Sequence, residues 1–133
     1  MNQQIRDFPS NGHSDSPPWR IYKKTSEITD PPPVKLWVMI DENPDSINDA
    51  AFAVGMNYMG RSSLWQDGPG TGHGGACGFT FADGHSEIKK WKDGRTTRRP
   101  MLTTYSYRFP YGVLHGDSQD IQWIQERTTA KIQ

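Results

Sequence analysis

Cysteine is almost absent from this chain of 133 residues, which contains only Cys77. One cysteine cannot form an intrachain disulfide, and it does not reveal the redox compartment of the protein. Cys77 lies between Ala76 and Gly78 in an apolar run, a setting that is typical of a small buried side chain rather than of a catalytic thiol. We therefore expect Cys77 to be buried in the core.

Long apolar segments are also missing. No run approaches the ~18 apolar residues that a membrane-spanning helix needs, and no signal peptide is recognisable. Only 33% of the residues are hydrophobic, whereas 13 are glycine and 10 are proline. This composition predicts a loop-rich domain with short strands.

An excess of charge of one sign is lacking too. The 15 basic residues balance 15 acidic ones, so the net charge gives no reason to expect binding to nucleic acid or to an anionic membrane surface. The length fits one domain. Residues 1–18 are polar and contain several turn-forming residues, which predicts a flexible or extended lead-in, and we expect residues 19–133 to form one globular domain.

The clearest pattern that is present predicts a β-hairpin over residues 77–91. Apolar and polar residues alternate on both sides of Asp83-Gly84. Asp-Gly is a strong signal for a two-residue turn, because both residues tolerate positive φ. The side chains that we expect to cover the core are Phe79, Phe81, Ile88 and Trp91.

A second apolar run, VKLWVMI at residues 34–40, predicts a strand. Because nearly continuous apolarity is typical of a strand covered on both faces, we expect it in the middle of the sheet. Near the C-terminus, Ile121 and Ile124 form the apolar side of a short helix that Asp117 or Ser118 can cap. The predicted fold class is therefore α+β, with an antiparallel sheet of three to five short strands, long loops and a C-terminal amphipathic helix.

The acidic loop DENPDSIND at residues 41–49 is the first candidate site. Its oxygen donors stand at alternate positions, a spacing that can surround a calcium ion. These donors are Asp41, Asn43, Asp45, the carbonyl of Ile47, and Asp49. The match to an EF-hand loop is partial, because Ser46 and Phe52 occupy the positions of its glycine and its bidentate glutamate. The alternative is a turn at Pro44 followed by a short capped helix over residues 50–54.

His73, Asp83 and His85 form the second candidate site. Imidazole and carboxylate groups ligate metals, and imidazole titrates near neutral pH, so convergence of these three side chains would indicate a small metal-dependent hydrolase. The alternative is structural. Asp83 then forms the turn, and His73 hydrogen-bonds to the backbone where the hairpin begins.

An aromatic surface is the third candidate site. The chain contains five tryptophans and five tyrosines, and such side chains stack on sugars where they are exposed but more often belong to the core of a small β domain. The residues that could form this surface are Trp65, Tyr105, Tyr107 and Tyr111. A carbohydrate-binding β module would require two or three of them to be coplanar and exposed.

The hairpin region resembles a known family. His73, nine further residues and then Asp83-Gly84 match the signature of the H-X9-DG proteins, which are prepilin-type processing-associated proteins similar to type II secretion pseudopilins. The segments YKKTSEITDPPPVKLWVMIDENPDSINDAAF, FADGHSEIKKWKD and DIQWIQERTT also resemble members of the planctomycete and verrucomicrobial type. The resemblance covers roughly residues 20–128, and a signature spread over several segments is more specific than one short motif.

This resemblance implies a non-enzymatic interaction protein, the globular head of a pseudopilin-like subunit in a secretion- or pilus-type assembly. It implies a periplasmic, cell-envelope or extracellular location, with other pseudopilin subunits or the exported protein as partners. Type II secretion pseudopilins often hold calcium in a loop of the head, so calcium is the cofactor that the resemblance suggests for residues 41–49. Pseudopilins reach the membrane through an N-terminal apolar helix. Residues 1–18 do not resemble that helix, so we expect the likeness to cover the head only.

Overall fold

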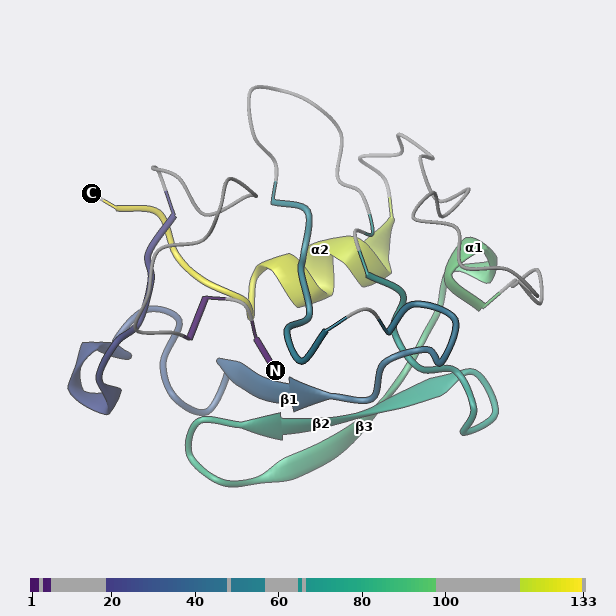
Figure 1. The fold of residues 1–133 in the computed structure, drawn as a ribbon, viewed down its shortest axis with the longest axis horizontal. Helices are drawn as coiled ribbons and strands as arrows, with labels where there is room; N and C mark the ends of the chain where they lie inside the picture. Colours follow the sequence, from purple (N-terminus) through teal and green to yellow (C-terminus); the bar gives the residue numbers. More distant parts are fainter. Residues whose placement is uncertain are drawn as a thin grey trace.

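The computed structural model describes residues 1–2, 4–5, 19–47, 49–56, 65, 67–97 and 118–132. Its elements in chain order are the 3-10 helix η1 (Thr25–Glu27), the strands β1 (Trp37–Ile40), β2 (Ala76–Phe81) and β3 (Ser86–Lys90), and the helices α1 (Gly94–Thr97) and α2 (Gln119–Gln125) (Figure 1). The predicted α+β class, with a small antiparallel sheet and a C-terminal helix, is confirmed.

The sheet has the strand order β1-β2-β3, and both strand pairs are antiparallel. The prediction that residues 34–40 form the middle strand is wrong, because β2 is central and β1 lies beside it. The apolar run has another cause. Leu36 and Trp37 are buried in two separate hydrophobic clusters, whereas Val34 and Met39 are 54% and 59% exposed. The apolar run therefore contributes one buried side chain to each of two clusters, and two of its other side chains are exposed.

β2 and β3 form the predicted hairpin, but its turn is longer than expected. The N–H of Phe81 donates to the carbonyl of His85 at 2.9 Å, which leaves residues 82–84 as the loop. Gly84 has a φ of 92°. This is the pattern of a three-residue hairpin loop, in which the last residue takes the left-handed conformation.

The longer loop changes which side of β3 faces the core. With a two-residue turn Ile88 would oppose Phe79, whereas in the structure Ile88 opposes Gly78. A shift of one residue in register moves every side chain of a strand to the other face. The prediction that Ile88 covers the core is therefore wrong, and its side chain is 71% exposed, whereas Trp91 is buried as predicted.

Helix α2 lies across the inner face of the sheet, and the main core lies between them (Figure 1). Phe79 of β2 packs edge-on against Trp123 of α2, with ring centroids 5.1 Å apart. Ile121, Ile124 and Cys77 are buried, as predicted. The other buried members of this core are Trp37, Phe52, Val54, Trp65, Phe81 and Trp91.

Asp120 attaches α2 to the end of the hairpin. Its side chain is fully buried, and its carboxylate accepts the N–H groups of Lys92 at 3.0 Å and of Asp93 at 2.8 Å. The Nζ atom of Lys89 lies 4.0 Å from Asp120 Oδ1. The charge is thus surrounded by donors, which is the condition under which a buried carboxylate is tolerated.

The described residues of the predicted flexible or extended lead-in contact the rest of the fold. Asn2 is fully buried, and its Nδ2 atom donates to the carbonyls of Trp37 at 2.8 Å and of Thr128 at 3.1 Å. Gln4 is 1% exposed. Residue 3 and residues 6–18 of the predicted lead-in lie outside the described residues.

Candidate functional site

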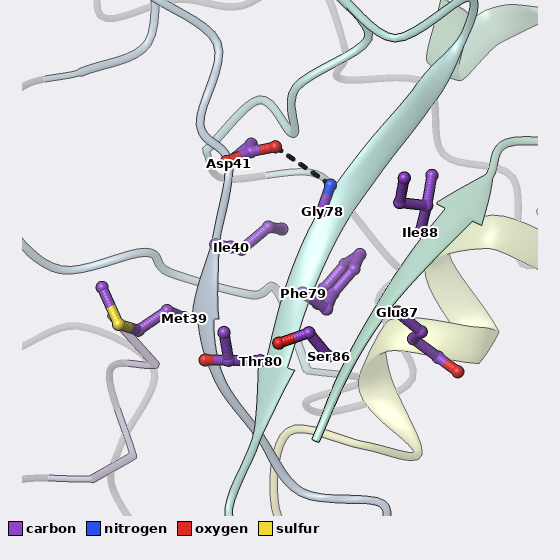
Figure 2. Close-up of a pocket in the computed structure, with 9 residues that line it drawn as sticks. All are labelled: Met39, Ile40, Asp41, Gly78, Phe79, Thr80, Ser86, Glu87 and Ile88. Carbon is purple, nitrogen blue, oxygen red and sulfur yellow. Dashed lines mark hydrogen bonds between the residues drawn. The ribbon is translucent and has the colours of Figure 1, made fainter. Parts of the chain in front are cut away.

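Asp41 links the acidic loop to the hairpin. It follows β1 directly, and its Oδ2 atom accepts the N–H of Gly78 at 3.0 Å (Figure 2). The same oxygen lies 3.5 Å from Nε2 of His73. The contact found for His73 is therefore with a carboxylate, whereas we expected a backbone group.

Two glycines allow the chain to approach Asp41 this closely. A Cβ atom at Gly78 would lie 2.8 Å from Asp41 Oδ2, and one at Gly70 would lie 2.9 Å from the Asp41 carbonyl oxygen. That carbonyl accepts the N–H of Gly70 at 2.6 Å and the thiol of Cys77 at 3.2 Å. A larger residue at either glycine would push Asp41 away from the hairpin.

Four of the five predicted calcium ligands line one open hollow of about 680 Å³, together with His73. The four are Asp41, Asn43, Ile47 and Asp49. Asp45 is not among the lining residues. The structure thus brings most of the predicted ligands, and the signature histidine, to the same side of the molecule.

Hydrogen bonds within the acidic loop already engage its side-chain oxygens. Asn43 Oδ1 accepts the N–H of Asp45 at 3.1 Å, and Asp49 Oδ1 accepts the N–H of Ala51 at 2.7 Å. In the described part of the chain, no group of three or more His, Cys, Asp or Glu side chains is placed to hold a metal ion. These bonds are those of a turn, and calcium binding stays a prediction.

The short helix that we offered as the alternative to calcium is not formed. Residues 50–54 instead contribute two isolated β-bridges, from Phe52 to Asn2 and from Val54 to Trp65.

The turn at Pro44 is formed, because the N–H of Ser46 donates to the carbonyl of Asn43 at 2.8 Å. Ser46 and Asp49, which we expected to cap the helix, instead accept the N–H groups of Gly68 at 2.8 Å and of Ala51 at 2.7 Å. The alternative is therefore correct for the turn and wrong for the helix.

His73 does not converge with Asp83 and His85. It stands where β2 begins, whereas the other two follow the end of that strand. His85 Nδ1 lies 2.5 Å from Asp83 Oδ1, and its ring stacks on Phe81 with centroids 4.3 Å apart. The hydrogen bond from the His85 side chain lowers the pKa of Asp83. Asp83 and His85 thus form a pair at the turn, and the three-residue metal site that we considered is not assembled.

Trp65 is the only member of the predicted aromatic surface within the described residues. It is 8% exposed and packs edge-on against Trp91, with ring centroids 5.6 Å apart. Trp65 therefore belongs to the core and offers no free face to a sugar. Tyr105, Tyr107 and Tyr111 lie outside the described residues.

The sequence reasoning missed the face of the sheet opposite α2, which we call the outer face. It consists of Met39, Gly78, Thr80, Ser86 and Ile88 (Figure 2). Met39 on β1 is 59% exposed and Ile88 on β3 is 71% exposed. Gly78 lies between them on the central strand β2. A shallow hollow of about 470 Å³ crosses this face. The register of β3 could have revealed the outer face. If we had assumed a three-residue loop from the sequence, we would have placed Ile88 opposite Gly78.

Two partly buried carboxyl groups, Glu42 in the acidic loop and Asp67, have raised pKa values. Burial disfavours the charged form of each group. Asp67 Oδ2 accepts the N–H of Ala53 at 2.5 Å, and the nearby charge of Asp49 raises the Asp67 pKa further. A carboxyl group with a raised pKa in the folded state costs stability as the pH rises above its unfolded value. These two groups therefore favour the folded state more at acidic than at neutral pH.

The helices within the described ranges are too short and too polar to cross a membrane. No protein-family model, no curated protein and no solved structure matches this chain. The function is therefore inferred from the geometry of the chain and from the H-X9-DG resemblance of its sequence.

Proposed function

We propose that this chain is the globular head of a pseudopilin-like protein of the H-X9-DG type, a non-enzymatic interaction subunit of a secretion- or pilus-type assembly in the bacterial cell envelope. The positions of the signature residues support this role. His73 stands at the start of β2 beside Asp41, and Asp83-Gly84 forms the turn after it. The nine residues between His73 and Asp83 contain the whole of β2. The spacing of the signature therefore corresponds to one strand and its short flanking segments.

The outer face carries this proposal. Met39 and Ile88 expose large apolar side chains there, and Thr80 and Ser86 supply polar groups beside them. Exposed apolar groups with a polar surround are typical of surfaces that bind other proteins. Among the residues that the structure describes, no helix lies on this face of the sheet (Figure 1).

The mechanism is surface complementarity. Neighbouring pseudopilin subunits or the exported protein contact the outer face, in the periplasm or at the cell surface. The inner face holds the sheet in place through the Phe79–Trp123 contact and the buried Asp120. A backbone that a packed inner face already holds loses little conformational freedom on binding, which favours affinity.

Site-specific photo-crosslinking in the native bacterium tests this function. A photoreactive amino acid at Met39 is expected to crosslink to envelope proteins that mass spectrometry identifies as pseudopilin-type subunits. The control position is Ile132, which is 54% exposed and lies outside the strands of the sheet. Equal crosslinking at both positions, or none at Met39, would contradict the proposal.

A further inference from the structure

The free edge of β3 is the feature from which a partner can be derived. β3 is the last strand in the order β1-β2-β3, and in the described part of the chain no segment pairs with its other side. An unpaired edge presents N–H and C=O groups that can pair with another strand. Which residues present them follows from the register of the hairpin.

The hairpin register shows which β3 residues have free backbone groups. The N–H of Phe81 donates to His85, and the N–H of Trp91 donates to Gly75 at 3.0 Å. Hydrogen-bonded pairs alternate along an antiparallel ladder, so Glu87 and Lys89 bond to β2. The residues whose N–H and C=O groups point away from β2 are therefore Ser86, Ile88 and Lys90.

We propose that β3 pairs with β3 of a second copy of this chain, antiparallel about a twofold axis at Ile88. Each Ile88 then opposes Ile88 of the second copy in a hydrogen-bonded pair. Ser86 opposes Lys90, and Glu87 opposes Lys89. The two sheets join into one sheet of six strands, and the two outer faces become continuous.

Charge complementarity selects this register. Glu87 lies opposite Lys89 of the second copy in a non-hydrogen-bonded pair, and the twofold axis repeats this pairing. Within its own chain the Lys89 ammonium group also lies near the buried Asp120 and over the ring of Trp123, so Glu87 is attracted by a neighbouring charge and does not form a new ion pair. A slip of one pairing step in either direction would place Glu87 opposite Glu87, or Lys89 opposite Lys89. Like charges directly opposite each other destabilise a strand pair.

β3 has only part of the protection that natural edges use. Natural edges avoid pairing through short strands, lysines, bulges and prolines. β3 is short and carries Lys89 and Lys90, but it pairs with β2 without a register shift, contains no proline and exposes the β-branched Ile88 at its centre. Two five-residue strands bury much less than the roughly 1,600 Å² of a standard stable interface. We therefore expect a weak dimer that depends on concentration. This inference follows from β3 alone and does not require the envelope role.

Disulfide trapping of single-cysteine substitutions in the full chain tests the pairing. Ile88→Cys places two cysteines in a hydrogen-bonded pair with Cα atoms about 5.5 Å apart, within disulfide range. Ser86→Cys places its two cysteines four positions apart, about 13 Å along the strand, and should not form a disulfide. Met39→Cys is a control of similar exposure on another strand. Native Cys77 is fully buried and should not react.

We expect the Ile88→Cys chain to form a disulfide dimer at least about tenfold faster than the other two variants, since only its cysteines meet in this register. Equal rates for Ile88→Cys and Ser86→Cys would overturn the pairing, as would no dimer from Ile88→Cys. Circular dichroism checks that each variant is folded.

Sedimentation equilibrium of the unmodified chain supplies a second, independent measurement. The average mass should rise with concentration from 15.1 kDa towards twice that value. Glu87→Lys should shift this rise to higher concentration, and Ser86→Glu should shift it to lower concentration because it faces Lys90 of the second copy. A chain that stays monomeric at every concentration overturns the inference, whereas the envelope role is tested separately through Met39.

Discussion

The two faces of the sheet differ in how far their side chains are buried. On the inner face, the rings of Phe79, Trp91 and Trp123 pack edge-on with centroids 5.1 to 6.4 Å apart, and the buried carboxylate of Asp120 fixes α2 in place. On the outer face, Met39 and Ile88 are mostly exposed. The inner face accounts for the fold, whereas no helix of the described residues lies on the outer face, which is therefore the surface that we assign to an interaction.

The largest effect should come from removing the inner-face anchor. Asp120→Ala leaves the part-buried N–H groups of Lys92 and Asp93 without their carboxylate acceptor. We expect the free energy of unfolding to fall by about 3 kcal/mol or more, measured by urea denaturation. Asp120→Asn keeps one oxygen acceptor and should cost clearly less. A loss for Asp120→Ala as small as that of an average surface substitution would show that this carboxylate does not anchor α2.

The next effect concerns Asp93, which adjoins this anchor. Arg95 binds its carboxylate through Nε at 2.9 Å and Nη2 at 2.6 Å, and this lowers the Asp93 pKa to about 2. Because the folded pKa lies below the unfolded value, the stabilisation is present above pH ~4 and is lost as the pH falls to about 2. Asp93→Asn should therefore cost at most about 2 kcal/mol at pH 6. A cost that does not shrink towards pH 2 would rule out this ion pair as the cause.

A smaller effect is expected where the outer face meets the acidic loop. Gly78→Ala places a methyl group 2.8 Å from the Asp41 carboxylate, and we expect a loss of about 1 kcal/mol as Asp41 moves. Gly72→Ala is the matched control, because a Cβ there meets nothing within 4 Å. If the two variants have the same melting temperature, the close approach at Gly78 is not required.

The turn formed by the acidic loop predicts no effect from removing calcium, in contrast to the calcium site that the sequence predicts. Asn43 and Asp49 already use their side-chain oxygens to accept backbone N–H groups. EDTA should therefore leave the melting temperature unchanged. A ligand that binds only the native state must raise the melting temperature, so a rise on adding calcium, reversed by EDTA, would establish the metal site and correct our interpretation of the loop.

Local patterns in the sequence predicted much of the inner face. Alternation placed Phe79 and Phe81 in the core, and the helical spacing of Ile121 and Ile124 predicted a buried helix face. These signals depend on neighbours in the chain, which a sequence displays directly. The α+β class followed from them.

Features that depend on register or on distant contacts were not predictable. One extra residue in the hairpin loop reversed the faces of β3, so Ile88 was assigned to the core and the outer face was missed. The role of Asp120 depends on backbone groups of Lys92 and Asp93, and that of Asn2 on a carbonyl at Thr128. Nothing in the local sequence indicates such partners.

The double variant Met39→Thr/Ile88→Thr, produced in the native host and also purified, tests directly whether the inner face holds the fold and the outer face binds partners. Both side chains are exposed, so we expect the free energy of unfolding to stay within about 0.5 kcal/mol of the native value. The account predicts that the variant nevertheless loses its association with envelope complexes. A variant that keeps this association, with unchanged stability, would contradict the assignment of the outer face as the interaction surface.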